Sequence, residues 1–325
     1  MDENALIARL SESAGEVPSH VEIFPVRQYS IDEMMRRARR LIAAAGEMRD
    51  AAFDRGDWVQ QESRTLVRLP LGGRAVIHHA SGAVEVRTGL APMESLFQKE
   101  EPRESLIGLV KATAERLRIC EWAGSRESLQ FERLWLLKAA ATDREGKVTP
   151  SVLCRVVGAY RHLAGSLPVW GAASVALKLG GGGTLDSIAV QIRETSGEPI
   201  DWAPVIRPDE AARQVVLQLA GLLGRSKAAS AVSVTPKAMH FGYLSLGKRS
   251  AQRVLAPFYV AFIEVEGDEA QAYQLVVSAT ENTYLPLCQA GTQPPPAQLR
   301  RAKPASQLQR LQPRENVRLE KSADC

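Results

Sequence analysis

Cysteine is scarce in this sequence, and no cysteines have the spacing of a disulfide framework or a metal site. Four cysteines occur among 325 residues, and no two of them form a Cys-x-x-Cys pair. This spacing excludes a disulfide framework and a zinc knuckle. The four are Cys120, Cys154, Cys288 and Cys325. Cys154 lies in an apolar, strand-like run, where we expect it to act as a small buried hydrophobe.

Long apolar runs are also missing. No stretch reaches the roughly 18 apolar residues that a membrane-spanning helix needs. The first ten residues, MDENALIARL, are acidic and polar and lack the basic start and apolar core of a secretion signal. We therefore expect a cytoplasmic protein. A secreted mature form, from which a signal has been removed, remains an open alternative.

Neither sign of charge is in excess in the main body of the chain. The stretch beyond residue 290 holds seven of the 41 basic residues and three of the 37 acidic ones, so the rest carries 34 of each sign. A balanced body has no overall field that attracts nucleic acid or an anionic membrane. The stretch 290–325 is basic and rich in Pro, Gln and Arg. Such a composition cannot build a core, so we expect a disordered tail.

Catalytic signatures are absent as well. None of the five histidines belongs to a His-Glu-x-x-His motif, and no serine lies in a Gly-x-Ser-x-Gly elbow. His78 and His79 are adjacent in a predicted strand, so their side chains point to opposite faces and cannot readily share a metal ion. The sequence therefore predicts no metal site and no cofactor. It favours a protein that is not an enzyme.

What the sequence does contain is a helix followed by short strands, three times over. Ser30 and Glu33 form a capping box, and apolar residues at helical spacing continue to Ile42. A second helix begins near Pro102 and a third at Pro208, a residue suited to the first helical turn. Alternating apolar and polar runs with glycine turns follow each helix, which indicates antiparallel strands. The predicted strands are 65–69, 74–78 and 83–87; 131–140, 152–163, 173–179 and 185–192; and 240–246, 258–265 and 273–279.

This order predicts an α+β fold of tandem units, each a helix covering an antiparallel meander, and not a parallel sheet. A short strand is also expected at 21–26. The expected division of the chain is a flexible start at 1–19, units at 20–100, 101–200 and 201–289, and the basic tail at 290–325.

The segment from Tyr160 to Ile188 has the clearest turn signals in the chain, namely glycines and a proline between strand-like runs. It is interpreted as a strand, a turn at Gly165–Pro168, a second strand, a turn of four glycines at Gly180–Gly183 and a returning strand. A phosphate-binding loop needs a helix and a lysine after its glycines. Here Thr184 opens another strand, so a hairpin turn is the favoured interpretation.

The same segment resembles the propeptides of thermolysin- and fungalysin-type metalloproteases, including the domain called PepSY. In those propeptides a strand leads to a Gly-x-Pro-Val turn, a Val-x-Leu strand, a glycine turn and a returning strand. The matching residues are Gly165, Pro168, Val169, Gly171, Val175, Leu177, Gly183 and Leu185. The stretches Leu255–Phe262 and Ala272–Ala279 are similar to the final strand pair of the same propeptides. One extra residue separates Gly165 from Pro168, and the glutamine that often precedes the turn is absent.

The resemblance implies PepSY- or cystatin-like units and a propeptide-like protein that carries no protease active-site motif. Such a protein would inhibit, chaperone or scaffold a protein partner, a metalloprotease among the candidates. Adding a partner's strand to an open sheet edge is a favourable way to do so. Pro168, Val169 and Trp170 are the candidate partner-binding residues, because an aromatic residue at a turn often serves contact. A tryptophan that caps a core is an equal alternative.

Two further hypotheses come from other functional classes. The chain could be an enzyme, such as a biosynthetic cyclase or isomerase, with a small-molecule pocket between a curved sheet and its helix. The pocket candidates are then His79, Tyr160 and His162. The basic tail could instead serve an RNA- or membrane-associated factor. The partner, the substrate and the oligomeric state stay open, and only the family analogy ranks protein contact first.

Overall fold

Each of the last three helices is followed by a run of strands in this computed structural model, which describes residues 2–142, 146–172, 174–225, 233–266, 271–285 and 287. The helices are α1 (Glu3–Ser13), α2 (Ile31–Glu47), α3 (Arg103–Arg116) and α4 (Pro208–Arg225). The strands are β1 (His20–Pro25), β2 (Asp57–Gln60), β3 (Arg64–Arg68), β4 (Arg74–His78), β5 (Ala83–Arg87), β6 (Glu127–Ala139), β7 (Val152–Ala164), β8 (Leu167–Trp170), β9 (Val175–Leu179), β10 (Leu185–Val190), β11 (Asp201–Pro204), β12 (Ser233–Leu244), β13 (Val254–Leu255), β14 (Pro257–Glu266) and β15 (Gln271–Ser278).

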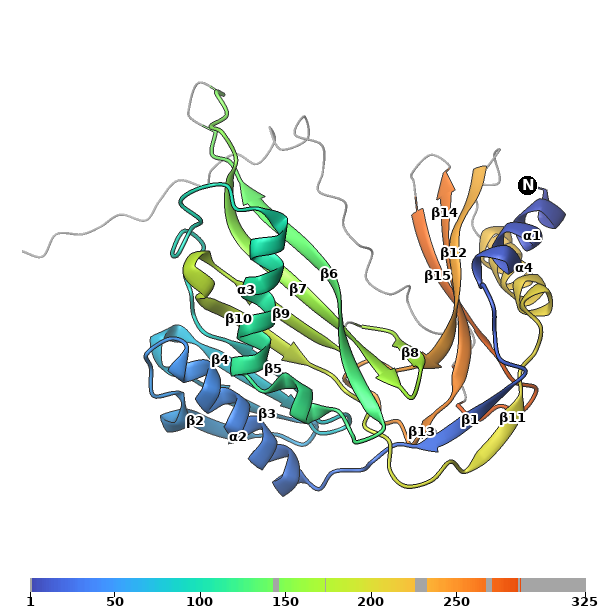
Figure 1. Ribbon diagram of the computed structural model, residues 1–325, viewed down its shortest axis with the longest axis horizontal. Helices are drawn as coiled ribbons and strands as arrows, with labels where there is room; N and C mark the ends of the chain where they lie inside the picture. The colour runs from blue at the N-terminus through green and yellow to red at the C-terminus, as the bar shows by residue number, and fades with distance from the viewer. Residues whose placement is uncertain are drawn as a thin grey trace, which may run out of the picture. The chain divides into compact units, whose positions relative to one another are not determined.

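Most of the described strands belong to one sheet of twelve. Its order is β15-β14-β12-β8-β7-β9-β10-β5-β4-β3-β2, with β6 on the remaining side of β7 (Figure 1). The smaller sheet has the order β11-β1-β13. Among the named strands of the described residues, β8 and β12 form a parallel pair and the others pair antiparallel. The fold class is therefore α+β, as the sequence predicts.

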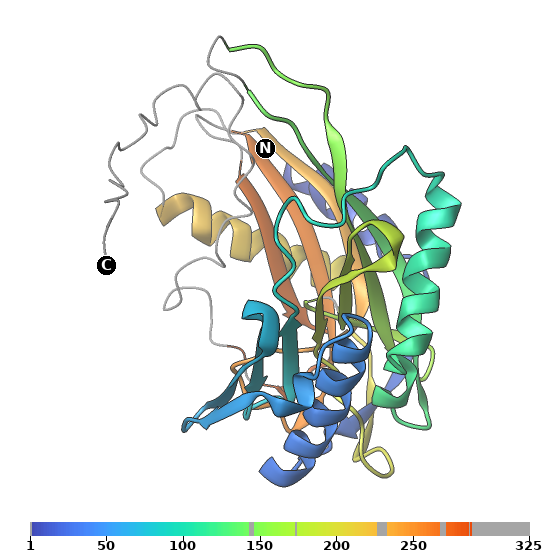
Figure 2. The same cartoon turned by 90° about the vertical axis from the view of Figure 1, so that its left-hand side faces the viewer.

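The first hydrophobic core lies between α2 and α3 and the strands β3, β4, β5, β7, β9 and β10. Helices α2 and α3 lie over one face of these strands, and Figure 2 shows the same arrangement turned by 90°. Both helices bury their apolar stripe: Leu41 and Ile42 in α2, and Leu106 and Val110 in α3, are almost fully buried. The pairing of β5 with β10 makes the strand layer continuous beneath both helices.

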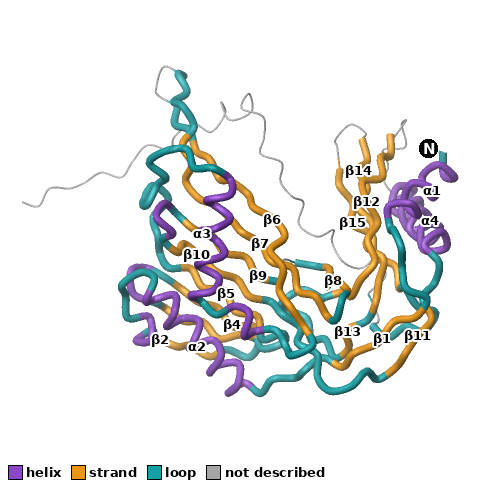
Figure 3. Tube along the Cα trace, in the orientation of Figure 1, coloured by secondary structure: helices purple, strands orange, loops and turns teal. Residues whose placement is uncertain are grey.

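A second core is formed by α1, α4, β1 and the strands β12, β14 and β15. Helices α1 and α4 lie beside each other and beside these strands (Figure 3). Leu6 and Leu10 of α1 are buried against Val215 and Leu219 of α4 and the strands. Among the described residues, no helix is long and apolar enough to cross a lipid bilayer.

Several local predictions are confirmed by the structure. Ser30 caps α2, its hydroxyl accepts from the Glu33 backbone N–H, and the Glu33 carboxylate accepts from the Ser30 backbone N–H. Helix α4 begins at Pro208. The four glycines form the turn of the β9–β10 hairpin, where Gly182 and Gly183 have φ of 65° and 78°. Cys154 is buried.

Two features of the predicted organisation are wrong. Residues 1–19 are not a flexible start, because α1 buries Leu6 and Leu10 in the second core. The boundaries near residues 100 and 200 do not separate domains either. Residues assigned to the first two units share one core, and β1 pairs with β11 from the third. Residues 1–286 form one unit, and the predicted tail at 290–325 lies outside the described residues.

Candidate functional site

The predicted contact turn around Trp170 makes its contacts inside the chain. Its indole Nε1 donates to the Phe241 backbone carbonyl at 3.0 Å, and its ring stacks on His240 at 4.6 Å between centroids. The Arg161 guanidinium lies 4.7 Å from the Trp170 centroid. Burial and the nearby Arg161 charge lower the pKa of His240, so the stacked ring is neutral at pH 7. The indole thus joins β8 to β12.

Pro168 and Val169, the other two residues of this turn, also make their contacts within the chain. Strand β8 pairs antiparallel with β7 through Leu163 and Pro168, and parallel with β12 through Val169 and Tyr243. Val169 is 1% exposed and offers no surface to a partner. Pro168 and Trp170 are half-buried. The structure therefore assigns β8 the role of a connection between the two parts of the large sheet.

The predicted pocket residues are not brought together. Tyr160 and His162 lie two apart in β7, and Tyr160 packs edge-to-face on Phe131 with centroids 5.6 Å apart. Burial raises the pKa of Tyr160 to about 12. His79 follows the end of β4, where its ring nitrogens lie 2.9 Å from Thr65 Oγ1 and 3.0 Å from the Glu62 carbonyl. Among the described residues, no contact links His79 to the other two.

His162 lies in a buried contact with a carboxylate that sequence reasoning missed. Its Nε2 lies 3.1 Å from Oε2 of Glu127, and both side chains are 1% exposed. The Glu127 carboxylate also accepts from the backbone N–H groups of Gly124 at 2.7 Å and Thr195 at 2.6 Å. Burial acts to raise the pKa of Glu127, but the contact and charge of His162 and the two backbone donors bring it below its ordinary value. This sealed pair binds two loops to β7.

Among the described residues, the space between the first core's strands and helices is filled by side chains. Buried aliphatic residues of α2, α3 and the strands occupy it, including Val110, Val156 and Leu177. A hollow of about 600 Å³ beside the end of α2 is shallow and open. A second hollow, beside Tyr29 and Trp122, has about 10 Å³, the room of one water molecule at most. Among the described residues, no three His, Cys, Asp or Glu side chains are placed to hold a metal ion.

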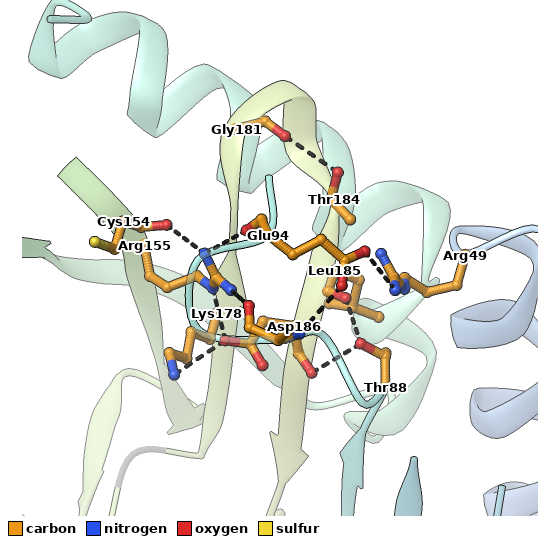
Figure 4. Close-up of polar contacts among 11 residues, drawn as sticks. Arg49, Thr88, Glu94, Cys154, Arg155, Lys178, Gly181, Thr184, Leu185 and Asp186 are labelled. Atoms are coloured by element: carbon orange, nitrogen blue, oxygen red, sulfur yellow. Dashed lines mark hydrogen bonds and ion pairs between the residues drawn. The ribbon is translucent and has the colours of Figure 1, made fainter. Parts of the chain in front are cut away.

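Arg155 and Asp186 form a second buried polar cluster (Figure 4). The Arg155 guanidinium binds the Asp186 carboxylate at 2.9 Å and donates to the backbone carbonyls of Ala91, Glu94 and Cys154. The Lys178 ammonium lies 3.0 Å from the same carboxylate. Because every contact on the guanidinium is within the protein, the cluster fixes the loop after β5 to the strands.

The edge of β6 is the most open feature of the described sheet. Strand β6 runs for 13 residues and pairs with β7, and no described strand pairs with its other edge. In its distal half Trp135, Leu136 and Leu137 are 42%, 41% and 42% exposed, and Val152 on β7 is exposed beside them. Successive strand residues point to opposite faces, so both faces of this hairpin are apolar. In the sequence, the run Leu134–Leu137 has four apolar residues without alternation, and this pattern could have indicated a strand that is apolar on both faces.

Comparisons with known proteins place this chain only by its fold. No protein-family model matches the sequence, and no curated protein matches it. A crystal structure of an uncharacterized protein from Eubacterium rectale ATCC 33656, at 1.45 Å resolution, is similar with a TM-score of 0.53 and 10% sequence identity. The match covers 86% of this chain and 97% of that chain. At this identity the likeness concerns the fold and not the function.

Proposed function

We propose that this chain is a non-catalytic protein that acts by protein–protein contact, as an inhibitor, chaperone or scaffold of its partner. The resemblance of the segment 160–188 to metalloprotease propeptides supports this class of function, and a metalloprotease is one candidate partner. The surface that would make the contact is the free edge of β6. The turn at Pro168–Trp170 pairs with β7 and β12, so it would hold in place β7, the strand on which β6 lies.

The length and composition of the β6 edge carry the proposal. An unpaired strand edge presents a row of free N–H and C=O groups that can pair with another strand, and soluble proteins usually keep such edges short or charged. The end strands β2 and β15 have four and eight residues, whereas β6 has 13. Its distal half adds three exposed apolar side chains in a row, Trp135–Leu137. Backbone pairing would supply affinity and these side chains would supply specificity. An extended partner segment with apolar side chains fits this edge.

The filled interface between sheet and helices counts against the enzyme hypothesis. An active site for a small molecule is usually a preformed concave pocket with a few polar groups pointing into it. Tyr160 and His162 are buried in packed surroundings, and His79 lies apart from both. The sealed Glu127–His162 pair has no access for a substrate.

Site-specific photocrosslinking in the cells that naturally make the protein tests the proposal. A photoreactive amino acid replaces Leu136 in the full chain, and a matched variant carries it at Gln130, an exposed position on the same strand outside the apolar half. We expect a discrete adduct with one protein from position 136 and none from position 130. A Trp135→Lys change should remove that adduct because it places a charge in the apolar contact.

Two results would contradict the proposal. One is the absence of any adduct at position 136, or the same set of adducts at both positions. The other is an adduct made of two copies of this chain, which would identify the β6 edge as a self-association surface.

A further inference from the structure

Three arginines form a straight row across the strands β3, β4 and β5. In the strand register Arg68 lies directly opposite Arg74, and Arg74 lies directly opposite Arg87. The alternate residues Val67, Ala75 and Val86 are buried beneath α2 and α3. Since successive strand residues point to opposite faces, the three arginines lie on the face that turns away from the helices. All three are exposed. We call this set the arginine row.

The arginine row forms no ion pair among the described residues. No ion pair, hydrogen bond or ring contact involves Arg68, Arg74 or Arg87, even though Asp57 of β2 lies opposite Arg68. Arginines elsewhere on the sheet are paired, such as Arg155 with Asp186 and Arg161 with Glu132. Like charges directly opposite one another destabilise a sheet. Repulsion within the arginine row therefore lowers the stability of the sheet. Residues that lower stability are often retained for function, and three adjacent guanidinium groups suit the binding of an anionic group.

A row of aliphatic residues runs beside the arginine row on the same face. Val59, Leu66 and Val76 are opposite one another in β2, β3 and β4. Val59 is exposed, and Leu66 and Val76 are half-buried. Each lies two residues along its strand from the arginine row, or about 7 Å away. Glu85 of β5 lies opposite Val76 at the end of this aliphatic row, and its carboxylate pairs with Lys248. The face therefore offers a positive stripe beside an apolar stripe that ends at this ion pair.

We propose that this face of β2–β5 binds an amphipathic, acidic helix of a protein partner. The inference rests on the proposed function in one respect, namely that the partner is a protein. Adjacent strands lie about 4.8 Å apart, so the arginine row spans roughly 10 Å. Carboxylates at positions i, i+4 and i+7 of a helix cover about the same length at 1.5 Å per residue. The neighbouring apolar side of that helix meets Val59, Leu66 and Val76.

Charge balance favours an acidic protein segment over nucleic acid. The chain outside the stretch 290–325 carries 34 residues of each sign, so it has no extended field to hold a polyanion. Nucleic-acid affinity grows with the number of neutralised phosphates, and three arginines supply few. Guanidinium groups bind carboxylates through two parallel hydrogen bonds, which suits a short acidic helix.

Fluorescence anisotropy with the purified full chain tests the inference. The probe is a synthetic helical peptide with glutamates at i, i+4 and i+7 and leucines on the adjacent side; a second peptide has glutamine in place of glutamate. We expect Arg74→Glu to weaken binding of the glutamate peptide about tenfold or more. The matched control Arg40→Glu makes the same charge change on α2 and should leave affinity within about twofold. A lysine version of the peptide should bind the Arg74→Glu variant better than the wild type.

Thermal unfolding separates a binding role from a structural one. Changing the three arginines to glutamine should raise the melting temperature by about 1–3 °C, because the repulsion disappears, while the glutamate peptide loses its affinity.

Equal binding of the glutamate and glutamine peptides overturns the inference, as does an equal loss of affinity with Arg40→Glu. Tighter binding of a single-stranded oligothymidine than of the glutamate peptide, sensitive to Arg74→Glu, would identify a nucleic-acid surface instead. None of these measurements involves β6, so they fail independently of the crosslinking test.

Discussion

Buried polar side chains in this protein connect segments that are far apart in the sequence. The Glu127 carboxylate binds β7 and the backbone at residues 124 and 195, and Arg155 binds three backbone carbonyls and Asp186. Arg193 is buried too and donates to the Ser250 carbonyl at 2.6 Å. Burial lowers the pKa of Arg193 to about 10, so its guanidinium is still charged at pH 7. The terminal nitrogens of Arg193 donate to backbone carbonyls of Ala80, Gly247 and Ser250, which fixes these loops, while its buried Nε has no hydrogen-bond partner among the described residues.

Replacing Glu127 by glutamine should destabilise the fold by about 2–3 kcal/mol at pH 7, because the buried carboxylate accepts from two backbone N–H groups and lies against His162, and an amide cannot serve all three contacts. The urea-unfolding midpoint measures the loss. Exposed Glu198, which pairs with Arg126 at 2.8 Å, provides the matched control. Its replacement by glutamine should change the free energy of unfolding by less than about 0.5 kcal/mol. A similar loss in both variants would show that the burial of Glu127 does not matter.

The Glu127 carboxylate should also make the free energy of unfolding depend on pH. The pKa of Glu127 is lower in the folded chain than its ordinary value of 4.5, so the ionised form stabilises the fold. That contribution is complete above the unfolded pKa and is lost as the pH falls through the lower folded pKa. The difference in unfolding free energy between wild type and Glu127→Gln should therefore shrink as the pH falls from 7 to about 3. A constant difference over this range would contradict the assignment.

At the scale of elements, the four-residue strand β8 decides how the two parts of the large sheet join. It lies between β7 and β12, and the close approach depends on a glycine in β12. A Cβ on Gly242 would collide with the Pro168 carbonyl oxygen and lie 2.7 Å from Trp170 Nε1. The same approach lets the indole reach the Phe241 carbonyl. Pro168, Trp170 and Gly242 thus form the close contact between β8 and β12.

Gly242→Ala should lower the free energy of unfolding by about 2 kcal/mol, because either β8 or β12 must move to admit the methyl group. Chemical denaturation measures this change. Gly221→Ala in α4 is the control, since no heavy atom lies within 4 Å of its added Cβ. That helical change should stabilise the fold by about 0.5–1 kcal/mol. An unchanged stability of Gly242→Ala would mean that β8 and β12 do not need this approach.

For residues 1–286 as a whole, the chain completes its second core with its first helix. Helix α1 brings Leu6 and Leu10 to α4 and β12, more than 200 residues away in the sequence. Met239 also donates its backbone N–H to the Ser13 hydroxyl at 2.8 Å. The three helix-and-strand units of the sequence are therefore arranged as two cores, and neither core is made from a single contiguous stretch.

Leu10→Ala should destabilise the protein by about 3 kcal/mol, since Leu10 is 0% exposed and its loss leaves a cavity. Leu217→Ala on α4, where the leucine is 72% exposed, should change stability by less than about 0.5 kcal/mol. Thermal melts followed by far-ultraviolet circular dichroism compare the two variants. If Leu10→Ala matched Leu217→Ala, α1 would not belong to the folded core.

Sequence patterns over short distances predict much of the local structure. The capping box at Ser30, the start of α4 at Pro208 and the glycine turn between β9 and β10 follow from backbone chemistry within a few residues. The arginine row was partly accessible too, because Arg68 and Arg74 flank one predicted hairpin turn symmetrically. The strand β2 and the helix α1 were missed, since their patterns are weak without the surfaces on which they pack.

The segment around Trp170 shows which features follow from the local sequence and which depend on the tertiary structure. Its strands and turns follow from residue order alone, because glycine and proline restrict or permit backbone angles locally. Whether Trp170 faces a partner or its own chain depends on the pairing of β8 with β12, which joins residues more than 70 apart. The Glu127–His162 contact likewise depends on the β6–β7 register. The sequence by itself determined the α+β class and most strand positions, and the tertiary structure alone decided which edges stayed open, because register and burial arise from contacts distant in the chain.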